Sequence, residues 1–133
     1  MKKIVTSGKR KTAIARAIIS EGTGKVIINK KDHTQLQMFD KLKIDEPLRI
    51  ADQILGKTNF DILISVKGGG EKGQIEAARL ALARAILKFS KSKELEKVYD
   101  DYDWSLVTAD VRRKEACKPG DSKARAKRQK SFR

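Results

Sequence analysis

The sequence predicts an α+β fold, a two-layer α/β sandwich with helices on one face of a sheet, followed by an extended basic C-terminal tail. Short β-branched segments and segments with helical apolar spacing occur in the order strand, strand, strand, helix, strand, helix. The 133 residues suffice for one domain with a single modest core. The last sixteen residues, 118–133, hold seven Lys or Arg and almost no apolar side chains, so they cannot form a core of their own.

The first 29 residues are expected to supply three strands. A short β-branched run at residues 3–6 leads into a predicted loop at residues 7–12, which contains three consecutive cations. Residues 13–20 (AIARAIIS) place small and branched side chains at successive positions, which predicts a strand buried on most of its surface. A glycine-containing turn at residues 21–24 and the run KVIIN at residues 25–29 then predict a hairpin.

Two longer helices and one further strand follow. Asp45-Glu46-Pro47 predicts a helix start, because Pro is best tolerated in the first turn of a helix, and Gly56 predicts its end. Residues 60–67 (FDILISVK) are apolar at every second position, as in a half-buried strand. Apolar residues at helical spacing predict a helix over residues 74–89, and residues 92–100 predict a short acidic one.

Charge is concentrated at the two ends of the chain. Of the net charge of +14, residues 1–31 and 111–133 contribute +8 each, residues 32–91 contribute +2 and residues 92–110 contribute −4. This distribution predicts a globular domain over residues 1–110 and a basic tail beyond it, both making directed contacts with a polyanion. Extended, the last sixteen residues span roughly 50 Å. Because ordering the backbone costs about 1 to 2 kcal/mol per residue, this segment is expected to stay mobile until a polyanion orders it.

Several function classes are excluded or disfavoured. Cys117 is the only cysteine, so the chain can form no intramolecular disulfide and no Cys-based zinc site, which favours a reducing compartment. No apolar run is long enough for a signal peptide or a membrane span, which predicts a soluble cytoplasmic protein. No Ser or Thr has a plausible general base, and His33 has no second metal-binding partner. We therefore expect no enzyme activity, no cofactor and no metal.

The glycines of residues 68–73 formally match a dinucleotide-binding motif. They follow a late strand, however, and no further strand with an acidic end comes after them, so cofactor binding is not expected. Two interpretations stay open. The segment is either a structural turn or a site where glycine N–H groups and a helix N-terminus contact RNA phosphate, with Lys67 and Lys72 close by.

Two rival functions also remain. Asp100, Asp101, Asp103 and Asp110 could bind magnesium in an RNA-processing enzyme, although such a run is more often a solvated acidic face. A DNA-compacting protein would also be basic. The tail contains one aromatic residue, Phe132, which argues against a base-stacking platform and favours phosphate contacts through Lys and Arg.

Three segments carry a resemblance to a known family: SGKRKTAIARA at residues 7–17, VKGGGEKGQIEAARLALARA at residues 66–85 and ADVRRKEACKPGDSKARAKRQKSFR at residues 109–133. They resemble the family of the ninth small-subunit ribosomal protein in its archaeal and eukaryotic form, over essentially the whole chain. The chain departs from the family pattern at Cys117, where a lysine is usual, and at Asp121, in a stretch more often occupied by glycine.

The resemblance implies a two-layer sandwich with a left-handed βαβ crossover, which the general right-handed rule does not predict. It also implies a noncatalytic structural protein in the head of the small ribosomal subunit. Its partners would be the 3′ major domain of small-subunit ribosomal RNA, neighbouring ribosomal proteins and peptidyl-site transfer RNA, with no membrane. The DNA-compacting and enzyme hypotheses become the less favoured alternatives.

Site residues follow from the basic segments and this resemblance. In the globular domain, ribosomal RNA is expected to contact Lys9, Arg10, Lys11, Arg16, Lys67, Gly69, Gly70 and Lys72. In the tail, the residues expected to line the RNA passage are Arg112, Arg113, Lys118, Lys123, Arg125 and Lys127. Carried over by position, Arg128, Lys130 and Arg133 are expected to contact the transfer RNA backbone.

Overall fold

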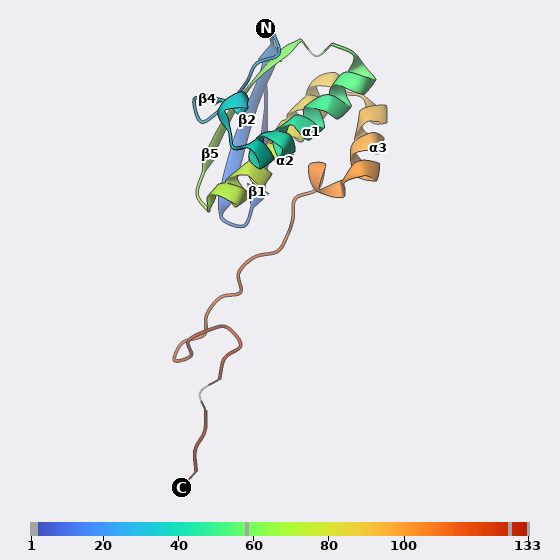
Figure 1. Cartoon of the computed structure of the whole chain (residues 1–133). Helices are drawn as coiled ribbons and strands as arrows, with labels where there is room; N and C mark the ends of the chain where they lie inside the picture. Colours follow the sequence, from blue (N-terminus) through green and yellow to red (C-terminus); the bar gives the residue numbers. More distant parts are fainter. Residues whose placement is uncertain (1–2, 58, 128, 133) are drawn as a thin grey trace.

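The computed structural model describes residues 3–57, 59–127 and 129–132, in which a five-stranded mixed sheet packs against three α-helices (Figure 1). The predicted α+β class is thus confirmed. The strands are β1 (Ile4–Arg10), β2 (Ala13–Glu21), β3 (Val26–Ile28), β4 (Lys31–Asp32) and β5 (Phe60–Lys67), in the spatial order β1-β2-β5-β3-β4. The helices are α1 (Met38–Leu55), α2 (Glu71–Ser90) and α3 (Lys93–Tyr102), with short 3-10 turns η1 (His33–Gln35) and η2 (Trp104–Leu106).

The hairpin predicted between residues 13–20 and 25–29 is wrong. β2 pairs antiparallel with β1 and β5, whereas β3 pairs parallel with β5 and antiparallel with β4. The carboxylate of Asp61, at the start of β5, accepts hydrogen bonds of 2.8 to 3.1 Å from the backbone N–H groups of Thr23, Gly24 and Lys25. These bonds hold the turn against β5, and the chain then crosses to the far side of β5 and does not fold back on β2.

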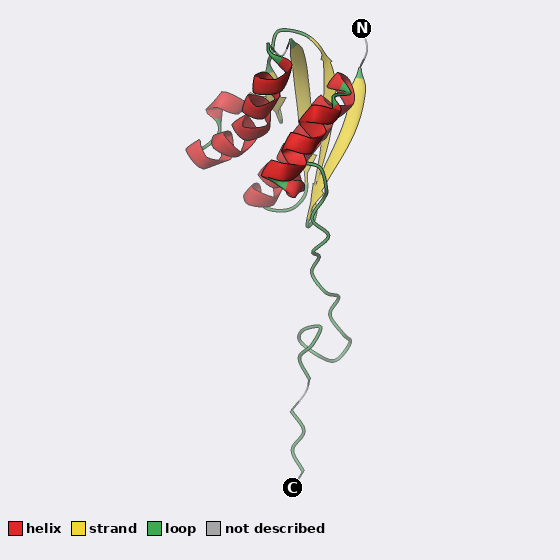
Figure 2. Ribbon diagram, turned by 90° about the vertical axis from the view of Figure 1, so that its right-hand side faces the viewer, coloured by secondary structure: helices red, strands yellow, loops and turns green. Residues whose placement is uncertain are grey.

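Only one face of β2 is buried, so the prediction of burial on most of its surface is also wrong. Ala13, Ala15, Ala17 and Ile19 are fully buried, while Ile14 on the opposite face is 51% exposed. This difference arises because the helices lie on the same side of the sheet and leave its other face uncovered (Figure 2). We call that uncovered surface the open face.

α2 lies very close to the strands that it covers. Its alanines are buried, and a Cβ placed on Gly8 of β1 would clash with the carbonyl oxygen of Ala77 and lie 2.7 Å from the N of Ala81. The hydroxyl of Thr6 donates a hydrogen bond of 2.9 Å to the carbonyl of Ala81. Small residues on both elements therefore permit a close contact in which a buried hydroxyl is satisfied.

α1 begins at Met38 and not at the predicted residues 45–47, so Pro47 lies inside the helix. Proline in a helix interior loses one backbone hydrogen bond and usually costs about 3 kcal/mol. Here Pro47 is fully buried and its carbonyl accepts a 2.7 Å hydrogen bond from the hydroxyl of Tyr99 in α3. Tertiary packing thus outweighs the local preference, while Gly56 ends the helix as predicted.

The predicted loop at residues 7–12 is shorter in the structure, since β1 continues to Arg10 and only Lys11 and Thr12 form the turn. Near the end of the domain in the sequence, Leu106 is buried, but Tyr102 and Trp104 are more than half exposed.

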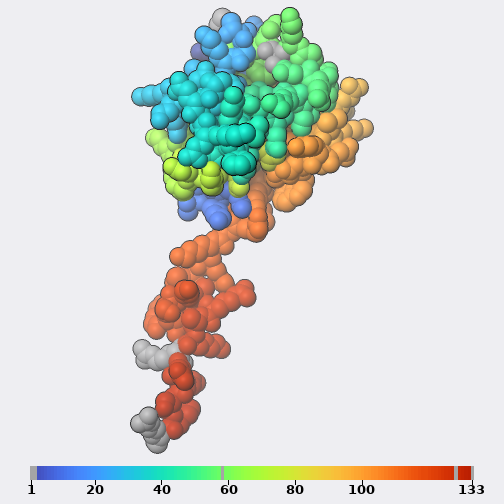
Figure 3. Space-filling model, viewed as in Figure 1, coloured from blue at the N-terminus to red at the C-terminus, as the bar shows by residue number. Residues whose placement is uncertain are grey.

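After η2 the described residues form neither helix nor strand, and the chain leads away from the domain (Figures 1 and 3). Nearly all of their side chains are exposed. Within the described chain, no helix is long and apolar enough to cross a membrane.

Candidate nucleic-acid interface

The basic turn and the glycine loop, distant in sequence, lie against each other at one end of the sheet. A Cβ on Gly68 would lie 2.7 Å from the carbonyl oxygen of Thr12, and one on Gly69 would lie 3.0 Å from the N of Ala13. The pairing of Ile14 with Lys67 across β2 and β5 sets this juxtaposition. We call this region the basic end; it comprises Lys9, Lys11, Lys67, Gly69, Gly70 and Lys72.

The glycines of the loop have different structural requirements. Gly68 and Gly69 have φ angles of +75° and +68° and touch the β1–β2 turn, so the structural-turn interpretation accounts for these two. Gly70 has a φ of −95°, a Cβ added to it would meet no atom within 4 Å, and it provides no side-chain cap for the N-terminus of α2. Phosphate contact at Gly69 and Gly70 stays a prediction.

Three of the predicted cations lie on the open face of the sheet. Lys9, Ile14 and Lys67 are aligned in one row across β1, β2 and β5, and Arg16 lies in the next row between Ser7 and Ser65. Among the described residues, the side chains of Lys9, Arg16 and Lys67 have no hydrogen-bond or ion-pair partner. Their charges are therefore free to attract an anion.

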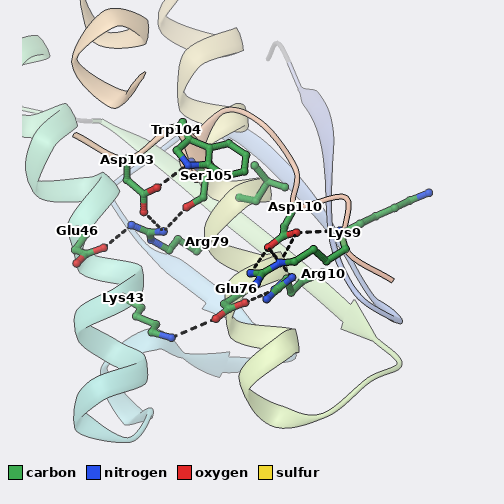
Figure 4. Close-up of a pocket in the computed structure, with 12 residues that line it drawn as sticks. Lys9, Arg10, Lys43, Glu46, Glu76, Arg79, Asp103, Trp104, Ser105 and Asp110 are labelled. Carbon is green, nitrogen blue, oxygen red and sulfur yellow. Dashed lines mark hydrogen bonds and ion pairs between the residues drawn. The ribbon is translucent and has the colours of Figure 1, made fainter. Parts of the chain in front are cut away.

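Arg10 has a different environment from Lys9, because neighbouring strand residues point to opposite faces. Its Nε donates a 2.6 Å hydrogen bond to Glu76 of α2, and its NH1 lies 2.7 Å from a carboxylate oxygen of Asp110 (Figure 4). That second contact is an ion pair without hydrogen-bond alignment. The side chain of Arg10 is only 15% exposed. Arg10 thus holds the chain at the point where the tail begins.

Asp110 also receives hydrogen bonds from Arg112. The guanidinium donates to both carboxylate oxygens over 2.7 to 3.1 Å, and the backbone N–H donates over 2.9 Å. These bonds, with the charge of Arg10, hold the pKa of Asp110 well below its usual range. We call the group Arg10, Glu76, Asp110 and Arg112 the root cluster.

A second ion-pair cluster, centred on Arg79 of α2, could not be found from the sequence. Arg79 pairs with Glu46 of α1 at 2.7 Å and with Asp103 at 3.0 Å, and it donates to the hydroxyl of Ser105 (Figure 4). Burial raises the pKa of Asp103, but hydrogen bonds from Ser105 and Arg79 outweigh it, so the net pKa is lowered. No sequence pattern indicates these long-range pairs.

The proposed magnesium-binding aspartates are not brought together. Asp103 and Asp110 are each engaged by arginine, in two different clusters. In the part of the chain that the structure describes, no group of three or more His, Cys, Asp or Glu side chains could hold a metal ion. Within these described residues, the nuclease hypothesis therefore has no assembled site.

Most of the remaining predicted contacts are exposed. Lys72 pairs with Asp40 at 2.8 Å, although the Lys72 side chain remains 61% exposed. Arg125 pairs with Glu115 at 2.9 Å, and both are so exposed that the pair contributes little. The tail side chains exposed without a side-chain partner among the described residues include Lys118, Lys123, Lys127 and Lys130. Arg128 and Arg133 lie outside the described residues.

Comparison with known proteins gives consistent matches along the chain. Residues 8–133 match the family model described as ribosomal protein S9/S16. The chain is 46% identical over 136 residues to small ribosomal subunit protein uS9 of Methanococcus vannielii, covering the full length of both. It is 44% identical to the protein of that name from Thermoplasma volcanium, covering 98% of each chain. For Pyrobaculum aerophilum the identity is 42%, covering 98% of this chain and 91% of the relative.

Proposed function

We propose, because this chain belongs to the ribosomal protein S9/S16 family, that it is a structural component of the small ribosomal subunit and binds ribosomal RNA there. It is a ribosomal protein of the cytoplasm and not an enzyme. Among the structural features, the observation that supports RNA binding most is the gathering of cations at the basic end, where Lys9, Lys11 and Lys67 have no side-chain partner among the described residues. Phosphate is the group that such cations, glycine N–H groups and a helix N-terminus attract together.

The basic end is proposed to dock the globular domain, residues 1–110, onto ribosomal RNA. Lys9, Lys11, Lys67 and Lys72 would contact phosphates, and the N–H groups of Gly69 and Gly70 would approach the RNA backbone. Arg10 would act indirectly, since Glu76 and Asp110 already occupy its guanidinium. Arg16 lies farther from this end, so its contact is the least supported of the set.

The tail, residues 111–133, is proposed to pass through the RNA of the 3′ major domain in the subunit head. Support comes from its exposed side chains and from the absence of helix or strand in its described residues. The proposed phosphate contacts along it are Arg112, Arg113, Lys118, Lys123, Arg125 and Lys127. Arg112 must loosen its pairing with Asp110 or contact RNA with its remaining N–H groups.

The end of the tail is proposed to contact the backbone of peptidyl-site transfer RNA through Arg128, Lys130 and Arg133. Subunits carrying a chain that ends at Lys127 are expected to assemble but to release this transfer RNA faster. A matched control is the full-length chain with Gln129→Ala, which removes no charge. Equal release rates for the truncated and full-length chains would reject this role.

The β3–α1–β5 unit is proposed to be the left-handed crossover that the family resemblance implies. Support comes from the parallel pairing of β3 with β5 and from the position of α1 between them in the chain. A crystal structure of the isolated protein would test the handedness, and a right-handed connection would refute it.

Salt dependence tests the RNA-binding mechanism. With six to ten phosphate contacts, the affinity for a 3′ major domain RNA fragment should fall about 10³- to 10⁵-fold between about 50 and 200 mM salt. Replacing Lys9 and Lys11 by Ala should make the slope of log affinity against log salt concentration shallower by roughly one per lost contact. Replacing the exposed Lys93 and Lys97 of acidic α3 by Ala should leave this slope unchanged. A salt-independent affinity, or equal losses in both double variants, would contradict the proposal.

A further inference from the structure

A continuous row of apolar side chains crosses the open face of the sheet. Val5 of β1 is paired with Ile18 of β2, Ile18 with Leu63 of β5, and Leu63 with Ile27 of β3. Val5 is 53% exposed and Leu63 is 52% exposed, while Ile18 and Ile27 are partly exposed. We call these four residues the apolar row.

The alignment across four strands is the unusual feature. A sheet with one uncovered face normally alternates apolar residues toward the core with polar residues toward water. Single exposed apolar residues are common and need no explanation, and β-branched residues favour strands in any case. Strand propensity, however, does not require that the apolar positions of four strands coincide in one register. The apolar row is therefore a surface suited to being covered.

The surroundings of the row indicate what would cover it. Ile18, Ile27 and Leu63 line a shallow hollow bordered by Arg16 and Lys30. Within the described chain, neither of these two cations has a side-chain hydrogen bond or an ion pair. The row contains no aromatic residue on which a nucleic-acid base could stack. Apolar side chains flanked by carboxylates would complement this surface, which is the chemistry of a protein partner.

We propose that the apolar row is the docking surface for a neighbouring protein of the small ribosomal subunit. That protein would place apolar side chains on the row and carboxylates against Arg16 and Lys30. The inference rests on the proposed function, since it requires the chain to reside in the subunit. It divides the open face in two: the basic end contacts RNA and the apolar row contacts protein. Arg16, at the boundary, is thereby reassigned from RNA phosphate to a protein carboxylate.

Photo-cross-linking in assembled subunits tests the division. The amino acid p-benzoylphenylalanine is introduced in place of Leu63 or, as the control, in place of Ile14, which is equally exposed but stands between Lys9 and Lys67. Small subunits are purified by sedimentation and irradiated, and the products are identified by mass spectrometry. We expect position 63 to cross-link to one ribosomal protein, at a segment with apolar residues and Asp or Glu, and position 14 to cross-link to RNA.

Substitutions supply a second measurement. Arg16→Glu should lower the protein cross-link from position 63 severalfold, and Arg16→Lys should largely retain it. Cross-linking of position 63 to RNA only, to a second copy of this chain or to nothing would overturn the inference, as would an Arg16→Glu variant with an unchanged yield. If the chain does not sediment with small subunits at all, the proposed function fails instead. Circular dichroism of the purified variants checks that each is folded.

Discussion

At the residue scale, neighbouring cations in one basic segment have different environments. Lys9 and Arg10 are adjacent in sequence, but β1 points their side chains to opposite faces of the sheet. Among the described residues, Lys9 has no hydrogen-bond or ion-pair partner on the open face, whereas Arg10 is largely buried between Glu76 and Asp110. A count of basic residues therefore overestimates the groups that are free for phosphate, and the backbone direction at each residue decides which ones are.

Gly8 is expected to be intolerant of any side chain. In Gly8→Ala the new methyl group would meet backbone atoms of Ala77 and Ala81, which cannot move without separating β1 from α2. Overpacking of this kind costs about 1 to 3 kcal/mol of unfolding free energy. Gly70→Ala is the matched control, because its Cβ would meet nothing within 4 Å, and its effect should stay within about 0.5 kcal/mol. Urea unfolding measures both, and equal effects would contradict the prediction.

Asp61 is expected to make the protein sensitive to acid. Hydrogen bonds from the backbone N–H groups of Lys25 and Thr23 lower the pKa of Asp61 in the folded state. A carboxyl with a lowered folded pKa stabilises the fold above its unfolded pKa of about 3.9, and this stabilisation is lost as the pH falls through the folded value. The melting temperature should therefore decline below about pH 4, and less steeply in Asp61→Asn. If the melting temperature of Asp61→Asn declined below this pH as steeply as that of the unchanged protein, this role would be contradicted.

At the element scale, the helical layer is joined by a few buried polar contacts. Arg79 connects α2 with α1 and with the segment after α3, and the hydroxyl of Tyr99 connects α3 with α1. These contacts thus join α1, α2 and α3, which are separate in the sequence, and the segment that follows α3. These contacts set where the chain turns toward the tail.

Tyr99→Phe should loosen α3 from α1. The substitution leaves the carbonyl of Pro47 without its buried 2.7 Å hydrogen bond, which should cost about 1 to 2 kcal/mol. Burial, and to a lesser extent the charge of Asp52, raises the pKa of Tyr99, so its hydroxyl remains a donor at all ordinary pH values. Tyr102→Phe is the control, because Tyr102 is 57% exposed and its contact with Glu46 is 3.4 Å long. Thermal unfolding should distinguish the two variants. A Tyr99→Phe variant as stable as the unchanged protein would contradict the prediction.

At the scale of the whole molecule, the β1–β2 turn and the start of the tail lie at the same end of the domain. Arg10 at the end of β1 pairs with Asp110, so the tail begins beside the basic end, and Figure 1 shows it leading away from there. The root cluster therefore sets the starting point of the tail relative to the surface that we propose for RNA.

Removing residues 111–133 should leave the domain folded and weaken RNA binding. The truncated chain keeps the core and the Arg10–Asp110 pair, and among the described residues it loses mostly exposed side chains and the contacts of Arg112 and Arg113 with Asp110. The slope of log affinity against log salt concentration should therefore become shallower by about six, one for each proposed tail contact. Circular dichroism and RNA binding measured on the same sample provide the comparison. Loss of the fold, or an unchanged salt slope, would count against the division at residue 110.

The sequence alone determined the features that depend on local pattern. The alternation in β5, the helical spacing in α2 and the concentration of charge at both ends are properties of short segments, so they could be recognised without the fold. The family resemblance rests on such segments too, and the family match confirms it.

Only the tertiary structure decided which segments pair. β3 lies beside β5, with its preceding turn bound by Asp61, and α1 extends through Pro47 because packing outweighs a lost hydrogen bond. The burial of Arg10 and the apolar row likewise depend on register between strands that are far apart in the chain. The physical reason is that these energies come from contacts across long sequence separations, which no local pattern encodes.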